Sequence, residues 1–221
     1  STLAQSEEKP SKRGRPDIPG TFSVEFGFNQ PINKPDSLFS IGFFGSRTVN
    51  IYYQGDFRIG QSKFSFHPGI GFGMERYQFK DNYTLAYDDD SDLVELVPSP
   101  FGNTKKSMLV MNYLDIPMDI KYTLNPDDPN RSFNVAIGGR FGVLTESHLK
   151  FKYREDGETK KLKDKQNYNL NPIRYGVSLK VGIGNFKLFG YYDLSTRFKK
   201  DLGPQETDMT NIVFGISLGA F

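Results

Sequence analysis

The sequence predicts an all-β protein, an eight-stranded antiparallel up-and-down transmembrane β-barrel. The first observation is a recurring run of apolar residues at every second position, which is the period of a strand. The second is that long and short connections alternate between these runs. The third is the content of 20 Phe, 12 Tyr and 22 Gly, which suits a lipid-facing aromatic band around a crowded lumen.

Residues 113–124 show the strand period most clearly. The apolar positions are Leu114, Ile116, Met118, Ile120, Tyr122 and Leu124, and between them stand Asp115, Asp119, Lys121 and Thr123. One face of this strand therefore meets an apolar medium and the other meets water or paired polar groups. A soluble barrel or sandwich with apolar residues inside and a membrane barrel with apolar residues outside both produce this pattern.

Loop lengths favour the membrane barrel. The expected strands cover residues 20–28, 48–59, 63–79, 113–124, 133–143, 174–183, 186–195 and 211–221. Their connections run long, short, long, short, long, short, long, as in outer-membrane barrels with short periplasmic turns and long external loops. A soluble lipocalin-like barrel or sandwich remains the alternative, although such a fold gives no reason for long and short loops to alternate along the chain. Pro68 and Pro117 interrupt two strands, and each is expected to mark a bulge.

Composition excludes several classes of protein. A chain of 221 residues with 37% hydrophobic and 24% charged residues has no run of the roughly 20 apolar residues that a helical membrane span needs. The net charge is only +2 and the basic residues are scattered, so nucleic acid is not an expected partner. The absence of cysteine removes disulfides and thiolate metal sites. No cofactor or metal is expected.

The two ends of the chain carry processing signals in this interpretation. Residues 1–5 resemble the small-residue end of a signal peptide, and residues 6–19 are too polar to order themselves, so residues 1–19 are expected to form a flexible periplasmic tail. Residues 20–221 would form the barrel. The outer membrane is the expected location.

Several segments resemble the PorT-like outer-membrane β-barrel family of Bacteroidota. The resemblance rests on residues 113–117 (YLDIP) with Lys121 and Tyr122, residues 64–73 (FSFHPGIGFG), residues 191–194 (YYDL) and a final strand that closes on Phe221. It implies an exported eight-stranded barrel, and the namesake of the family is implicated in type IX secretion. Phe221 looks like a C-terminal barrel signal, although Phe214, Ile216 and Leu218 lie in the other register, which a bulge or a weakened signal would reconcile.

If the apolar faces meet lipid, the opposite faces supply a polar network to the lumen. Its expected members are Glu25, Asp56, Arg58, His67, Glu75, Asp115, Asp119, Lys121, Arg140, Arg174 and Lys180. Acids and bases are nearly balanced, and an unpaired buried charge is costly, so mutual pairing is the expected state. A proton path or a small-ligand site is the alternative.

Two charged loops are expected on the external side. The acidic loop contains Asp88, Asp89, Asp90 and Asp92, and the basic loop contains Lys150, Lys152, Arg154, Lys160, Lys161, Lys163 and Lys165. The acidic run lacks the glycine and the distal glutamate of an EF-hand, which favours a solvated loop over a calcium site. The basic residues could bind lipid phosphates, but the opposite charge and the shared side of the two loops predict that they pack against each other over the barrel mouth.

The functional prediction is a non-enzymatic accessory subunit of a larger machine for protein export or outer-membrane-protein assembly. Only His67 and His148 could supply a catalytic base, and no nucleophile or metalloprotease motif is present. Expected partners are outer-membrane lipids and other outer-membrane or periplasmic proteins. The alternative is a free-standing barrel that binds an external ligand or stabilises the envelope through its loops. A lipid-modifying enzyme, the third hypothesis, would need one of the two histidines.

Overall fold

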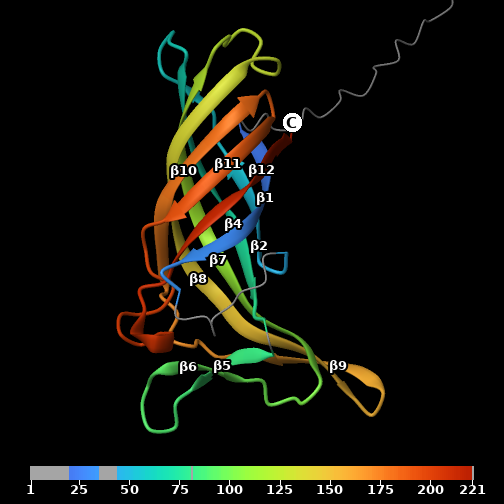
Figure 1. Ribbon diagram of the computed structural model, residues 1–221. Coiled ribbons are helices and arrows are strands. Elements are labelled where there is room, and N and C mark those ends of the chain that lie inside the picture. Colours follow the sequence, from blue (N-terminus) through green and yellow to red (C-terminus); the bar gives the residue numbers. More distant parts are fainter. Residues whose placement is uncertain (1–19, 35–43, 81, 221) are drawn as a thin grey trace, which may run out of the picture.

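The computed structural model describes residues 20–34, 44–80 and 82–220. Eight of its strands form a closed antiparallel barrel (Figure 1). They are β1 (Thr21–Ile32), β2 (Arg47–Gln54), β4 (Phe64–Gln78), β7 (Thr104–Thr123), β8 (Phe133–Glu155), β10 (Ile173–Ile183), β11 (Phe186–Asp193) and β12 (Thr210–Ala220). Each strand pairs with the next one of the eight, and β12 pairs with β1 to close the ring. The predicted eight-stranded up-and-down barrel is confirmed.

The remaining elements lie mostly beyond one end of the barrel. They are β3 (Phe57–Arg58), β5 (Tyr83–Tyr87), β6 (Val94–Pro98), β9 (Glu158–Asp164) and the 3-10 helix η1 (Pro204–Glu206). In Figure 1, β5, β6 and β9 gather below the barrel, at the end opposite the short turns. We call residues 79–80, 82–112, 144–172 and 194–209 the platform, and we call the other end of the barrel the turn end. No helix among the described residues is long and apolar enough to cross a membrane.

The barrel wall is apolar outside and polar inside. On β7, Leu114, Ile116 and Met118 are exposed, whereas Asp115 and Asp119 between them are buried. The other strands of the ring repeat this arrangement, so apolar side chains surround the barrel. A protein folded in water hides such residues, and a barrel in a bilayer presents them to lipid.

The pairing of β12 with β1 answers part of the question about the C-terminal register. It runs from Ile32↔Thr210 to Phe22↔Ala220 without a shift, so this segment contains no bulge. Phe214 and Leu218 face outward and Ser217 is buried. Phe221 itself lies outside the described residues, as do residues 1–19.

The prediction that Pro68 and Pro117 mark bulges is wrong. β4 pairs with β7 as far as Pro68↔Met118 and again from Gly71↔Asp115 in the same register, and Pro117 pairs regularly with Arg140 on β8. A proline only removes one N–H donor from the ladder. Because the two prolines lie on neighbouring strands, the missing donors fall in one short gap, and no extra residue is needed.

A bulge does occur at Thr145, where the barrel meets the platform. The register of β7 and β8 shifts between Asn112↔Glu146 and Tyr113↔Leu144, which leaves Thr145 unpaired. Its hydroxyl donates to the backbone oxygen of Asn112 at 2.9 Å. An extra residue exchanges the two faces of a strand. Odd-numbered residues of β8 therefore face outward before Thr145 and inward after it.

The inward faces beyond the bulge build a second core, inside the platform and at its junction with the barrel. Its buried residues are Tyr77, Phe79, Leu85, Val94, Leu109, Met111, Tyr113, Leu149, Phe151, Tyr168, Leu170, Phe198 and Met209. They come from three connections and from the extended ends of β4, β7 and β8. The platform thus has an apolar core, like a small water-soluble domain, at one end of a barrel whose lumen is ionic.

Candidate functional site

Arg174 on β10 is the centre of the lumen network. Its Nε donates to Asp115 Oδ1 at 3.1 Å, and its Nη1 pairs with Glu75. The guanidinium also lies 3.9 Å from the ring centroid of Tyr113. Tyr52 donates its hydroxyl to Asp115 at 2.8 Å. These charged groups are removed from water, so each depends on its partners inside the protein.

Two glycines give the Arg174–Asp115 pair the space it occupies. A Cβ on Gly73 would lie 2.2 Å from Arg174 Nη2 and 2.5 Å from Asp115 Oδ2. A Cβ on Gly142 would lie 2.2 Å from Asp115 Oδ1. Inward-facing glycines on β4 and β8 therefore make room in the narrow lumen for the arginine side chain.

A second group of charges lies nearer the turn end. Glu25 Oε2 accepts from Arg140 at 2.8 Å and from Asn50 at 2.9 Å, and Glu25 Oε1 lies 2.8 Å from Lys180 Nζ. Lys180 also donates to Asp119 Oδ2 at 2.9 Å. Residues from β1, β2, β7, β8 and β10 are thereby joined across the barrel.

Arg197 and Asp193 close the network at the platform, and neither was among the predicted residues. Arg197 lies 2.9 Å from Glu75 Oε2 and also pairs with Asp193. The inward position of Asp193 could have been read from the alternation of β11. Arg197 follows the end of that strand, where no periodic signal exists.

The network fills the barrel interior. Arg140, Arg174 and Arg197 are buried together with Tyr52, Tyr113 and Tyr191, and the guanidinium of Arg140 lies 4.3 Å from the Tyr191 ring centroid. The interior of an eight-stranded barrel is just wide enough for side chains. The arrangement therefore holds the strands together and leaves no room for a wide channel.

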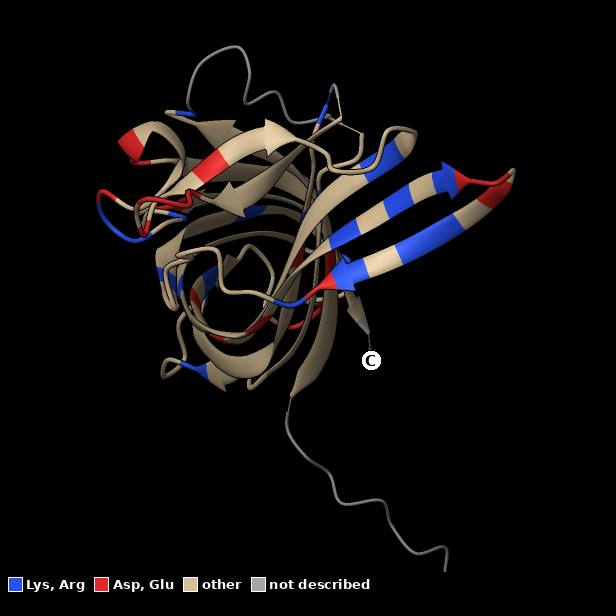
Figure 2. Ribbon diagram, turned by 90° about the horizontal axis from the view of Figure 1, so that it is seen from below, with Lys and Arg blue, Asp and Glu red and all other residues tan. Residues whose placement is uncertain are grey.

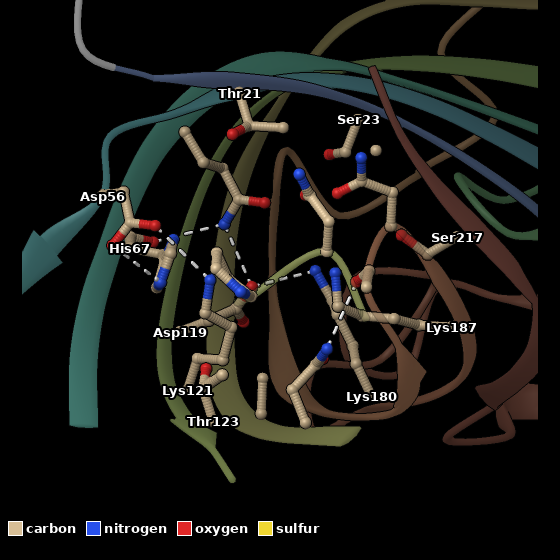
Figure 3. Close-up of a pocket in the computed structure, with 18 residues that line it drawn as sticks. Thr21, Ser23, Asp56, His67, Asp119, Lys121, Thr123, Lys180, Lys187 and Ser217 are labelled. Carbon is tan, nitrogen blue, oxygen red and sulfur yellow. Dashed lines mark hydrogen bonds and ion pairs between the residues drawn. The ribbon is translucent and has the colours of Figure 1, made fainter. Parts of the chain in front are cut away.

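The turn end contains a small polar cavity of about 220 Å³ (Figure 3). Lys121, Lys180, Lys187 and Asp119 line it, and His67 lies at its edge. Lys121 Nζ lies 3.4 Å from Asp56 Oδ2 at the rim. We call this cavity the vestibule, and the buried ion pairs of Lys180 and Asp119 form part of its lining.

His67 lies near a hydroxyl and a carboxylate, but not as in a catalytic triad. Its Nε2 is 2.8 Å from Ser65 Oγ and 3.4 Å from Asp56 Oδ1. A triad needs the carboxylate on one ring nitrogen and the nucleophile on the other. Within the described ranges no group of three or more acidic or histidine side chains could hold a metal ion. The absence of enzymatic activity stays a prediction.

Not all predicted lumen residues lie inside. Arg58 is exposed and donates to the backbone oxygen of Ser62 at 3.1 Å, so its assignment to the lumen is wrong. The reason is that β2 ends at Gln54 and the two-residue β3 extends past the barrel wall. Asp56 is half exposed at the same rim. Glu25, Glu75, Asp115, Asp119, Arg140, Arg174 and Lys180 are buried in the lumen, and Lys121 and His67 lie at the vestibule.

The acidic run forms the tip of the β5–β6 hairpin. Asp88 Oδ2 accepts the Ser91 hydroxyl at 2.6 Å, and this hydrogen bond lowers the pKa of Asp88. The basic run does not form a loop, because β8 continues to Glu155 and pairs with β9 in a second hairpin. Ion pairs of this hairpin join Lys160 to Glu155 and Lys165 to Glu146.

The two charged segments do not pair with each other. Among the described residues no ion pair joins them, and Figure 2 shows the basic hairpin extending to one side of the barrel, away from the acidic segments. Aromatic contacts connect the loops instead. The ring of Phe101 stacks on Tyr153 with centroids 4.1 Å apart, and Tyr87 stacks on Tyr168 at 5.9 Å.

A closed antiparallel ring with an apolar outer wall and an ionic lumen defines a membrane β-barrel. Comparison with protein families is consistent with this class, because residues 4–199 match the model described as "Outer membrane protein beta-barrel domain". The chain belongs to this family. Family and fold together locate it in the outer membrane. Barrels of this kind place their long loops on the external side, so we expect the platform to be external.

Solved structures give distant matches. Ail, the attachment invasion locus protein of Yersinia pestis, in complex with the heparin analogue sucrose octasulfate, is 14% identical, with a TM-score of 0.38 over 92% of this chain and 100% of that one. A second structure of Ail has the same identity and coverage with a TM-score of 0.34. A mutant porin of Rh. blastica is 10% identical, with a TM-score of 0.22 over 91% of this chain and 99% of that one. No curated protein matches the chain.

Proposed function

We propose that this protein is a non-conducting, non-enzymatic outer-membrane barrel that works through its external platform, by binding an external ligand or stabilising the envelope. The observation that carries the proposal is the platform core. Connections that only closed a barrel would need no buried set such as Leu85, Met111, Leu149 and Phe198. A shaped surface outside the membrane is what such a core provides.

The filled lumen supports the same function. Arg174, Arg140 and their acidic partners occupy the interior, so passage of solutes is not what the barrel is built for. Planar-bilayer recordings of the purified protein should show no conductance of porin size. Large, stable conductance steps would favour a transport function instead.

A platform variant tests the proposal directly. Residues 150–163 can be replaced by Asn-Gly, which shortens the β8–β9 hairpin to a tight turn. The barrel should still show heat-modifiable gel mobility. Cells that carry this variant should resemble a deletion strain in detergent sensitivity and in external ligand binding. Normal behaviour of the variant, in a strain where deletion has an effect, would refute a role for the hairpin in the platform.

An accessory role in a protein-export or barrel-assembly machine, such as type IX secretion, is the second candidate. This role is favoured by an open apolar pocket, a dent of about 380 Å³ in the lipid-facing wall of the barrel. Ile137, Val177, Leu179 and Tyr192 line it. Gly190 lies in this dent, and a Cβ added there would contact nothing within 4 Å. An apolar membrane segment of a partner protein would fit such a surface.

Gly190→Leu should fill the dent and reduce the recovery of any membrane partner after mild detergent extraction. Val143→Leu, another outward position, is the matched control. Recovery of the barrel alone in all cases, under conditions that preserve known outer-membrane complexes, would count against the accessory role.

A further inference from the structure

The outward face of the β7–β8–β9 sheet carries a dense set of cations. Lys106 on β7 pairs with Lys152 on β8, which pairs in turn with Lys161 on β9. On the barrel side of this row Lys150 pairs with Lys163. On the other side, nearer the tip of the hairpin, Arg154 pairs with Thr159. Residues directly opposite each other in a sheet share a face. We call Lys106, Lys150, Lys152, Arg154, Lys161 and Lys163 the cationic face.

The cationic face has no acidic partner within the part of the chain that the structure describes. No ion pair involves any of its members, and Arg154 donates only to the backbone oxygen of Gly157, at 3.2 Å. The Lys160–Glu155 pair belongs to the opposite face of the hairpin. Like charges placed directly across strands destabilise a sheet. A ligand that supplies negative charge would relieve this repulsion.

The cationic face continues the lipid-facing wall of the barrel. On β7, Lys106 has the same orientation as Leu114, Ile116 and Met118 in the membrane belt, because the face does not change along this strand between them. On β8 the bulge at Thr145 turns the even-numbered residues outward, and these include Lys150 and Lys152. The cations thus lie immediately beyond the apolar belt and on its side of the sheet.

The hairpin also leans toward the membrane plane. Lys106 is eight residues from Leu114, which is about 26 Å along a strand. Figure 1 shows that β9 and the part of β8 that pairs with it run sideways from the barrel, and we infer that this part of the sheet lies along the membrane surface. Figure 2 shows the same hairpin, with its bands of Lys and Arg, extending beyond the ring of strands. Half-buried Met108 and Val110 lie between the belt and the cations.

We propose that the cationic face binds the phosphate groups of anionic lipid headgroups in the outer leaflet, with lipopolysaccharide as the lipid. Neighbouring strands are about 4.8 Å apart, so Lys106, Lys152 and Lys161 form a row about 10 Å long that can contact more than one phosphate. The inference rests on the proposed function in one respect, that the platform is the external working part. It adds the chemistry of what one side of that platform binds.

Binding of fluorescent short-chain lipopolysaccharide to the folded full-length protein in detergent tests this inference. The variant Lys152→Gln, Lys161→Gln, Lys163→Gln removes three charges from the cationic face. The control variant Lys160→Gln, Lys199→Gln, Lys200→Gln removes three charges elsewhere on the platform. The first should bind at least about tenfold more weakly than the unmodified protein, since each lysine near an anionic surface contributes severalfold. The control should stay within about twofold.

Two further measurements separate the outcomes. Lipopolysaccharide from which the phosphates have been removed should bind as weakly as the face variant does, and added salt should weaken only the intact lipid. Equal loss in both triple variants, or equal binding of the dephosphorylated lipid, would overturn the proposal. So would a face variant that keeps lipopolysaccharide binding but loses binding of a sulfated polysaccharide.

The two proposals can fail separately. If the hairpin-shortened variant loses lipopolysaccharide binding while the detergent sensitivity of the cells is unchanged, the proposed function of the hairpin fails and the lipid site stands. If the same variant disturbs the envelope but binds the lipid normally, the lipid site fails.

Discussion

Removal of the central lumen cation should be strongly destabilising. Arg174→Met keeps the length of the side chain but leaves Asp115 without its arginine partner inside the barrel. Glu75 is affected less, because Arg197 remains 2.9 Å away. Asp115 keeps one hydrogen bond, from the Tyr52 hydroxyl at 2.8 Å. Arg174 is only 2% exposed, so water does not replace the lost partner.

The expected loss of unfolding free energy is about 3–5 kcal/mol, the usual cost of breaking a buried ion pair by removing one partner. With a urea slope of about 2 kcal/mol per molar, the midpoint should fall by about 1.5–2.5 M. Adding Asp115→Asn removes the unpaired carboxylate. The double variant should therefore recover part of the loss, which makes the two substitutions non-additive.

Urea titration of the barrel in lipid vesicles, followed by heat-modifiable gel mobility, measures these midpoints. Lys160→Met is the control, because it breaks the exposed pair with Glu155 and should leave the midpoint unchanged. A midpoint for Arg174→Met that differs no more than the control's would refute this reasoning. A double variant less stable than the sum of its single changes would refute the account of Asp115.

Three further changes test other parts of the fold. Burial lowers the pKa of His148 below its ordinary value of 6.5. As the pH falls through 6.5, His148 in the unfolded chain therefore takes up a proton while His148 in the folded platform is still neutral. Platform stability should fall as the pH drops below about 6.5, seen as faster proteolysis at pH 5.5 than at pH 8, and His148→Gln should flatten this dependence. Deletion of Thr145 should turn Leu149 and its neighbours outward and expose the platform to protease while the barrel still folds, whereas Thr145→Val should not. Gly142→Ala should lower the urea midpoint, because its Cβ would lie 2.2 Å from a carboxylate oxygen of Asp115; an unchanged midpoint would contradict the assigned packing.

The fold could be predicted from sequence because a barrel in lipid imposes one simple rule on each strand. Alternation between apolar and polar residues was enough to find all eight strands and the side of most lumen residues. The ends of the strands were less accurate. β7 begins at Thr104 rather than at residue 113, because Met108 to Met111 are apolar at consecutive positions and show no alternation.

The platform could not be predicted because the bulge is invisible in the pattern. Val143, Leu149 and Phe151 are all odd-numbered, so alternation assigns them to one face, whereas the structure sends the first outward and the other two inward. For the same reason the basic residues were expected in a loop rather than on one face of a hairpin. Arg197 was missed because it acts from a loop, where no period constrains it.

The reversal of polarity at Thr145 also fixes how deep the protein lies in its membrane. On the barrel side of this residue the outer surface is apolar, and on the platform side it carries lysines. A barrel shifted outward would expose Leu114 and Val143 to water, and one shifted inward would carry Lys150 toward hydrocarbon. Both displacements are unfavourable, so the protein cannot adjust to a thicker bilayer by sliding. A thicker bilayer would instead be matched by thinning of the lipid around the barrel or by association of barrels.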